Sequence, residues 1–272
     1  MKTNEKQPQK DKTPSEIVNQ SGFPLQIGIA HQVRQTKESH GWNVIYTEHS
    51  WTNSTNETSG FIDIVLENKQ GNLVLVIECK RLLDSEWIFL NQGHEIKARN
   101  HAKVWITKGV QGNPSICDWN DFAIDPASPE SDFCVVRGQD NNSRPMLERL
   151  AAGVISSIEG FAFEQLPLVG RTGRAKVIIF IPIIVTTAKL KICTFEPDKI
   201  TLGDGTIKEE KLQEVPYIRF RKQLSTAHYH VNLDYSHSDQ ASAKERTVFV
   251  VNAEKLIEFL GLVDASNSID SI

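Results

Sequence analysis

Apolar and polar residues alternate most clearly in two β-type runs, Phe61 to Glu67 and Leu73 to Glu78, which are separated by a polar turn. The second run is apolar at nearly every position before it ends, which is typical of a strand covered on both faces. Asp63 interrupts the apolar positions of the first run, and Glu78 and Lys80 lie at the end of the second. If the runs pair as an antiparallel hairpin, Asp63 and Glu78 lie near the same end of it.

Helical spacing, caps and chain breakers predict helices around this hairpin. The expected helices are a short one starting at Pro14 behind a Thr13–Glu16 capping box, Pro24 to about Ser39 with Gly41 as its stop, Arg144 to about Phe163 capped by Ser143, and Ala253 to Leu260 capped by Asn252. Apolar runs predict further strands at Trp42 to Glu48, Ala102 to Thr107, Asp132 to Arg137, Lys176 to Thr187, Lys189 to Phe195 and Thr247 to Val251. The polar stretch from His49 to Ser59 is expected to be a loop.

These elements predict an α/β fold with a mixed central sheet and one main domain. Residues 1–13 are expected to be a disordered tail, and residues 14–200 the domain itself. Residues 81–133 are rich in turn-forming residues, so we interpret them as an insertion with short strands. Residues 201–263 are expected to form strands and a helix that pack on the core, followed by a flexible tail at 264–272.

Composition narrows the class of protein. Hydrophobic residues make up 39% and charged residues 24% of the 272 residues, as in an ordinary globular protein, and the net charge is −4. The chain therefore lacks the basic surplus of a histone-like binder. No apolar run reaches membrane-spanning length, and the polar N-terminus does not resemble a secretory signal. The four cysteines have no metal-site or disulfide spacing, so we expect free thiols and a cytoplasmic location.

The charges at the end of the hairpin need a chemical explanation, because an unpaired buried carboxylate is unfavourable. Asp63 and Glu78 together would form the hard oxygen site that Mg²⁺ prefers, with Mn²⁺ as a substitute. The backbone carbonyl of Cys79 is a further candidate ligand. Lys80 shares a face with Glu78 and would reach an attacking water or a charged phosphate. The alternative is a surface hairpin on which Glu78 and Lys80 form a solvated ion pair.

Asp63 followed by Glu78-Cys79-Lys80 at the end of a hydrophobic strand resembles the PD-(D/E)xK, or restriction-endonuclease-like, nuclease superfamily. The resemblance extends from Pro14 to about Phe195, and the residue before Asp63 is isoleucine instead of proline. It implies an αβββαβ core and Mg²⁺-dependent hydrolysis of phosphodiester bonds. It also implies that Asp63 and Glu78 bind the metal and that Lys80 is catalytic.

The superfamily often carries an additional polar residue on its first helix near the metal. Glu16 and Gln26 are the candidates here, although Glu16 also fits the role of a helix cap. Trp51 could stack on a base or serve ordinary packing, and the stretch 91–94 could approach a phosphate or be a polar loop. The histidines at 228, 230 and 237 are better explained as polar surface than as metal ligands.

Basic residues at two places are candidates for contacts with nucleic acid. They are Arg171 and Arg174 in a loop, and Arg219, Arg221 and Lys222 in the segment from Val215 to Leu224. The leading hypothesis is an endonuclease or exonuclease, with DNA as the expected substrate, in restriction, repair or phage defence. It would act without a membrane, as a homodimer or as a subunit of a defence complex. The alternative is a non-catalytic subunit on the same scaffold that binds nucleic acid or protein.

Overall fold

The computed structural model describes residues 12–53, 57–110, 113–137, 145–171, 175–224, 237–265 and 269. The helices within these residues are α1 (Pro14–Gln20), α2 (Phe23–Gln35), α3 (Lys37–His40), α4 (Met146–Gln165), α5 (His237–Lys244) and α6 (Leu256–Leu262). Short 3₁₀ turns cover Leu166–Leu168, Pro197–Lys199 and Ala253–Lys255. No helix of the described residues is long and apolar enough to cross a membrane.

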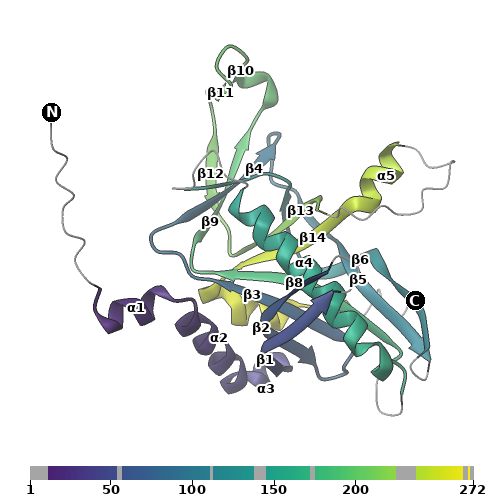
Figure 1. Cartoon of the computed structure of the whole chain (residues 1–272). Coiled ribbons are helices and arrows are strands. Elements are labelled where there is room, and N and C mark those ends of the chain that lie inside the picture. The colour runs from purple at the N-terminus through teal and green to yellow at the C-terminus, as the bar shows by residue number, and fades with distance from the viewer. Residues whose placement is uncertain are drawn as a thin grey trace, which may run out of the picture.

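The strands follow the same numbering as Figure 1. They are β1 (Trp42–Asn53), β2 (Thr58–Asn68), β3 (Leu73–Lys80), β4 (Glu86–Gln92), β5 (Ala98–Val110), β6 (Asn113–Ser131), β7 (Cys134–Val136), β8 (Val177–Thr186), β9 (Lys189–Phe195), β10 (Ile200–Thr201), β11 (Thr206–Ile207), β12 (Lys211–Glu214), β13 (Tyr217–Gln223) and β14 (Glu245–Asn252).

Local sequence signals placed several helix ends correctly. The capping box of α1 is present, with the Thr13 hydroxyl accepting from the Glu16 amide and the Glu16 carboxylate accepting from the Thr13 amide. Gly41 ends α3 at a φ of 76°, which glycine adopts at little cost. Asn252 caps the turn that leads into α6. The predicted cap at Ser143 lies outside the described residues, whose helix α4 starts at Met146.

In the described part of the chain, the main sheet contains eight strands in the order β1-β2-β3-β8-β14-β13-β6-β5. β1, β2 and β3 are antiparallel neighbours, whereas β8 runs parallel to β3 and β14 runs parallel to β8. The sheet is therefore mixed, as predicted. Helices α2 and α3 precede β1, and α4 precedes β8, whereas the four strands β4 to β7 lie between β3 and α4 in the chain.

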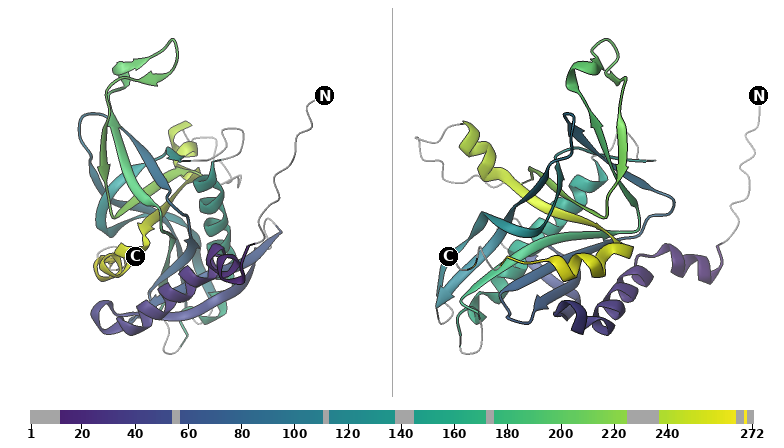
Figure 2. Two further views of the ribbon diagram at one scale, coloured as in Figure 1. Left: turned by 90° about the vertical axis from the view of Figure 1, so that its left-hand side faces the viewer. Right: turned by 180° about the vertical axis from the view of Figure 1, so that it is seen from behind.

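The other half of the main sheet closes on itself. The first residues of β8 pair with β5, and its last residues pair with β14. Since β14, β13, β6 and β5 are neighbours in that order, these strands and β8 form a closed ring. A second sheet, with the order β12-β9-β4-β7 among the described residues, stands beside the ring, and the β10–β11 hairpin projects from it (Figures 1 and 2).

Helices cover both faces of the β1-β2-β3-β8 part of the sheet. α4 packs on one face, where an apolar layer includes Val76, Phe161 and Phe180. α2 packs on the opposite face of β1, β2 and β3, and α6 lies against β14 and β6 (Figure 2). The apolar layer on this second face includes Val33 and Ile77. β3 is thus covered on both sides, which agrees with its continuous apolar sequence.

Two expectations about local structure were wrong. In the stretch from His49 to Ser59, which was expected to be a loop, the described residues up to Asn53 belong to β1 and those from Thr58 belong to β2, and these residues pair with one another. Residues 81–133 are not an insertion of short strands either. They contain β5 and β6, which are long strands of the main sheet, and Trp87 and Trp119 within them are buried. Cross-strand pairing outweighed the polar and turn-forming composition in both stretches.

The C-terminal segment is a part of the sheet rather than an addition to it. β14 lies between β8 and β13, so residues beyond 201 provide inner strands of the main sheet. Although only two residues separate β8 from β9, these strands enter different sheets. All four cysteines lie in described residues and are free thiols.

Candidate active site

The pairing of β2 with β3 places Asp63 beside Glu78. The ladder pairs Glu67 with Val74 and continues to the pair Ile64 and Ile77. One step further along this register, Asp63 in the middle of β2 faces Glu78 near the end of β3, just beyond the last pair of the β2–β3 ladder. Residues that face each other across an antiparallel pair have neighbouring side chains, so the hairpin brings the two predicted carboxylates together.

Beyond the last backbone pair of β2 and β3, the Asp63 carboxylate replaces a backbone carbonyl as the hydrogen-bond acceptor for β3. Its Oδ2 atom accepts a hydrogen bond from the backbone amide of Cys79, with a distance of 2.6 Å. Burial raises the pKa of Asp63, and this hydrogen bond opposes that effect. In a strand, the N–H and C=O of one residue point to the same neighbour. The Cys79 carbonyl therefore points toward the β2 side, where Asp63 lies, which suits its predicted role as a ligand.

Glu78 lies in an environment that disfavours its negative charge. Burial and, to a smaller extent, the Asp63 carboxylate raise the pKa of Glu78 to about 7, and Lys80 opposes this rise. Lys80 is half-buried, and its backbone carbonyl accepts a 3.3 Å hydrogen bond from the Thr187 amide at the end of β8. The lysine therefore compensates only part of the negative charge at this edge.

A third carboxylate, that of Glu48, belongs to the site, and the sequence did not indicate it. Thr47 pairs with Ile64 and His49 pairs with Ile62, which places Glu48 opposite Asp63 on the other side of β2. Glu48 raises the pKa of both Asp63 and Glu78. Its φ of 53° is unusual for a residue with a side chain and redirects its carboxylate. A glutamate in a predicted polar strand end carries no pattern that would have revealed this position.

Gln26 holds Glu48 and β2 together from α2. Its Nε2 atom donates to the Glu48 Oε1 atom at 2.6 Å and to the Asp63 backbone carbonyl at 2.9 Å. Gln26 is 6% exposed, so α2 places a buried polar residue at the site. Glu16, the other candidate, is exposed, and its carboxylate is engaged by Thr13 in the capping box. The cap role is therefore the one that the structure supports for Glu16.

The donor set fits a hard divalent cation in its chemistry. It offers the carboxylates of Asp63 and Glu78, the Cys79 carbonyl and, nearby, Glu48. Such oxygen ligands suit Mg²⁺, which keeps several water molecules and needs only one or two carboxylates. Among the described residues, no three or more His, Cys, Asp or Glu side chains are close enough together to hold a metal on their own. A cation at this edge would accordingly be bound by two carboxylates, a carbonyl and water.

Arg219, predicted to bind phosphate, is completely buried in the β-ring. Its Nη1 atom donates to the Pro126 carbonyl at 2.9 Å and to the Ser128 hydroxyl at 2.6 Å, and its guanidinium stacks over Phe249. Burial lowers the pKa of Arg219 to about 10, which leaves it charged at neutral pH. A side chain enclosed in this way is unavailable to a ligand, so the interpretation of Arg219 as a phosphate contact does not fit the structure.

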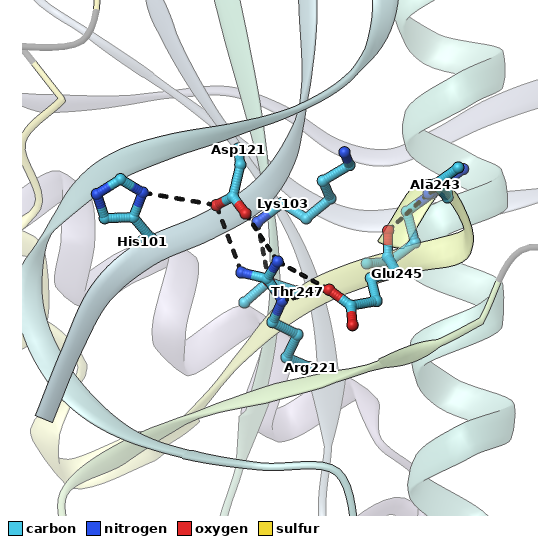
Figure 3. Close-up of polar contacts among 8 residues, drawn as sticks. His101, Lys103, Asp121, Arg221, Ala243, Glu245 and Thr247 are labelled. Carbon is cyan, nitrogen blue, oxygen red and sulfur yellow. Dashed lines mark hydrogen bonds and ion pairs between the residues drawn. The ribbon is translucent and has the colours of Figure 1, made fainter. Parts of the chain in front are cut away.

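Arg221 and Lys222 point into ion pairs. Arg221 bridges Asp121 at 2.7 Å and Glu245 at 2.8 Å, in a network that also includes His101 (Figure 3). These carboxylates raise the pKa of Arg221. Lys222 pairs with Glu148 at the start of α4. Both cations are thus matched by carboxylates of the chain itself.

The remaining residues predicted to contact nucleic acid differ in their exposure and in their packing. Arg171 is exposed, whereas Arg174 lies outside the described residues, as do the histidines at 228 and 230. Trp51 is 8% exposed and packs against α4, where a side chain on Gly160 would lie 2.9 Å from its ring. Trp51 therefore serves packing and is not available for base stacking. Asn91 bonds to the Glu95 carbonyl within its own loop.

Comparisons with known proteins add no relative. No family model, no curated protein and no solved structure matches this chain.

Proposed function

We propose that this protein is a Mg²⁺-dependent nuclease of the PD-(D/E)xK type that hydrolyses phosphodiester bonds, with DNA as the expected substrate. The observation that carries the proposal is the convergence of Asp63, Glu78 and Lys80 at the end of the β2–β3 hairpin. The antiparallel neighbours β1, β2 and β3 with a helix before them, and β8 parallel to β3 with α4 before it, are compatible with a restriction-endonuclease-like core into which β4 to β7 are added.

The chemistry assigns a role to each residue. A bound Mg²⁺ would lower the pKa of a water molecule and neutralise charge on a phosphate. Asp63 and Glu78 would hold the cation, and the Cys79 amide keeps the Asp63 carboxylate in place. Lys80 would position the attacking water and stabilise the charge that builds on the phosphate. Gln26 orients Glu48 toward the same edge, where its carboxylate can accept a proton or bind a water molecule.

The test is cleavage of plasmid, linear duplex and single-stranded DNA, and of single-stranded RNA, in Mg²⁺, in Mn²⁺ and in EDTA. We expect cleavage that requires the metal, and we expect the Asp63→Asn variant to lose both cleavage and thermal stabilisation by Mg²⁺. The Asp239→Asn variant on α5 is the matched control, because it changes an exposed carboxylate outside the site. The proposal would be rejected if the wild-type protein showed no metal-dependent cleavage and no thermal stabilisation by Mg²⁺.

The second candidate is a non-catalytic subunit on the same scaffold, which binds nucleic acid or protein. Its protein-binding form is favoured by the buried or ion-paired state of Arg219, Arg221 and Lys222, which leaves the β13 segment without free positive charge for nucleic acid. The two functions differ in the metal titration. Nucleic-acid binding without metal-dependent stabilisation or cleavage would support the subunit.

A further inference from the structure

Next to the candidate active site, the outer stripe of α2 borders a hollow of about 230 Å³. Phe23, Ile27, Ala30 and Arg34 are spaced at three or four residues, so they follow one side of the helix. Phe23 is 59% exposed and Ile27 is 67% exposed. An aromatic ring and an aliphatic side chain that remain this exposed on one helix stripe contribute little to the core and are available to a ligand.

The hollow is continuous with the site because two site residues line it. Gln26 and Glu48 form part of its wall, and they are the same residues that are joined to each other at 2.6 Å and to the Asp63 carbonyl through Gln26. A ligand group in the hollow would therefore lie beside Glu48 and Gln26, and Gln26 in turn contacts the backbone of Asp63. Arg34 provides a positive charge at the far end of the stripe.

On this basis we infer that the hollow is a stacking subsite for an unpaired nucleobase, so that the nuclease acts on single-stranded nucleic acid or on single-stranded ends. The inference rests on the proposed function and names the substrate class of the same site. A base would stack on Phe23 with its edge against Ile27, and Arg34 would contact a neighbouring phosphate. Paired bases cannot enter, because each is covered by its neighbours within the duplex.

The charges of the protein favour an unpaired nucleobase over a duplex as the ligand of this hollow. The chain has a net charge of −4, and the arginines and the lysine of β13 are buried or paired with carboxylates, so this strand offers no free positive charge to a phosphate backbone. Stacking on an aromatic side chain is independent of net charge and tolerates any base sequence. A short apolar subsite with one arginine therefore suits a few unpaired nucleotides better than a long duplex.

The test uses a 12-nucleotide oligothymidylate with a single 2-aminopurine, in Ca²⁺ to allow binding without turnover. We expect quenching of the 2-aminopurine fluorescence on binding to the wild-type protein, and weaker binding to a blunt duplex. Phe23→Ala should lose the quenching and weaken binding by about 5- to 150-fold, which is the effect of one aromatic stacking contact. Phe23→Trp should restore both.

Two control variants remove exposed apolar surface as Phe23→Ala does, but at positions outside the hollow. Phe133→Ala removes a phenylalanine that is 46% exposed outside the hollow, and Ile17→Ala removes an exposed side chain of the neighbouring helix α1. Both should bind the oligonucleotide like the wild-type protein.

Three results would overturn the inference in distinguishable ways. Wild-type binding and quenching by Phe23→Ala would remove the subsite while leaving the nuclease proposal intact. A loss of self-association in Phe23→Ala and Ile17→Ala, measured by light scattering and without an effect on the oligonucleotide, would make this surface an interface between copies of the chain. A wild-type protein that binds no nucleic acid and cleaves none would reject both the subsite and the proposed function.

Discussion

Two clusters of charged residues in this protein look alike in the sequence and differ in the structure. At the end of the β2–β3 hairpin, burial and the Glu48 carboxylate raise the pKa of Asp63 and Glu78, and the cation Lys80 lowers it. In the β-ring, Arg221 is held between Asp121 and Glu245, and Lys103 lies beside Asp121, so two cations face two carboxylates (Figure 3). Within the described residues, the first cluster has an excess of negative charge, whereas in the second the charges balance.

This contrast shows which charges are available for function. A balanced network satisfies its own donors and acceptors, so it stabilises a particular arrangement of strands and leaves nothing for a ligand. An unbalanced cluster of carboxylates is unfavourable until a proton or a cation joins it. Charge density alone, which suggested the β13 segment as a phosphate contact, does not separate these two cases.

Lys80→Ala should produce the largest effect, because it acts on the unbalanced cluster during the reaction itself. It removes the cation that lowers the pKa of both Asp63 and Glu78. We expect a loss of roughly 10²- to 10³-fold in cleavage rate, as for one preorganised electrostatic donor. Thermal unfolding in Mg²⁺ should show that the fold and the metal stabilisation persist. Cleavage at the wild-type rate would show that Lys80 is only a solvated charge.

Arg219→Met should mainly affect stability. The variant leaves the Ile124 and Pro126 carbonyls and the Ser128 hydroxyl without their buried donor. We expect a loss of about 2–4 kcal/mol in the free energy of unfolding, measured by urea denaturation. The cleavage rate per folded molecule should remain unchanged, and a stable variant with weaker nucleic-acid binding would instead restore the phosphate role.

Glu78→Gln tests the unbalanced cluster through pH. The pKa of Glu78 is raised in the folded state, so the folded wild-type protein binds more protons than the unfolded chain between pH 4.5 and about 7. Its stability without metal should therefore be fully present below pH 4.5 and decline as the pH rises to about 7.

At pH 8 without divalent metal, Glu78→Gln should accordingly be more stable than the wild-type protein. The expected difference is roughly 1–3 kcal/mol after allowance for solvent screening of a half-buried side chain. The difference should shrink below pH 5, and Mg²⁺ should stabilise the wild-type protein alone. If the variant is less stable at pH 8, Glu78 is an ordinary partner of Lys80.

Arg221→Gln should have the smallest effect. The Arg221 pair with Asp121 is partly exposed, and such pairs contribute about 0.2–1 kcal/mol each. We expect a decrease in stability of about 1 kcal/mol in chemical denaturation at low salt, and a smaller decrease at high salt. Asp121→Asn should produce a similar change, whereas a much larger loss of nucleic-acid binding in Arg221→Gln would contradict a structural role.

Much of the local structure could be predicted from residue patterns. The capping box at Thr13 and Glu16, the stop at Gly41 and the cap at Asn252 act within one turn of chain, so their effect is written in neighbouring residues. The β2–β3 hairpin was equally predictable, because alternation and a short polar turn set its register. The pairing of Asp63 with Glu78 follows from that register.

Other features depended on contacts between distant segments. Residues 49–53 are polar, yet they form a strand because they pair with the start of β2 and because Trp51 packs on α4. Only Ala102 to Thr107 of β5 was predicted as a strand and β6 was not predicted, because both extend through pairing with each other and, for β5, with β8. Such pairings join residues that are far apart in the chain, so no local pattern carries them.

Residue patterns were sufficient for the α/β class, the hairpin and the position of Asp63 and Glu78 on it, because hydrophobic alternation and turn chemistry act over a few residues. The packing of distant segments was needed to bring Glu48 and Gln26 to this site and to leave Phe23 exposed beside it. The same packing buries one arginine of β13 and pairs the next. A charge becomes functional or structural through its neighbours in space, and these come from other strands and helices.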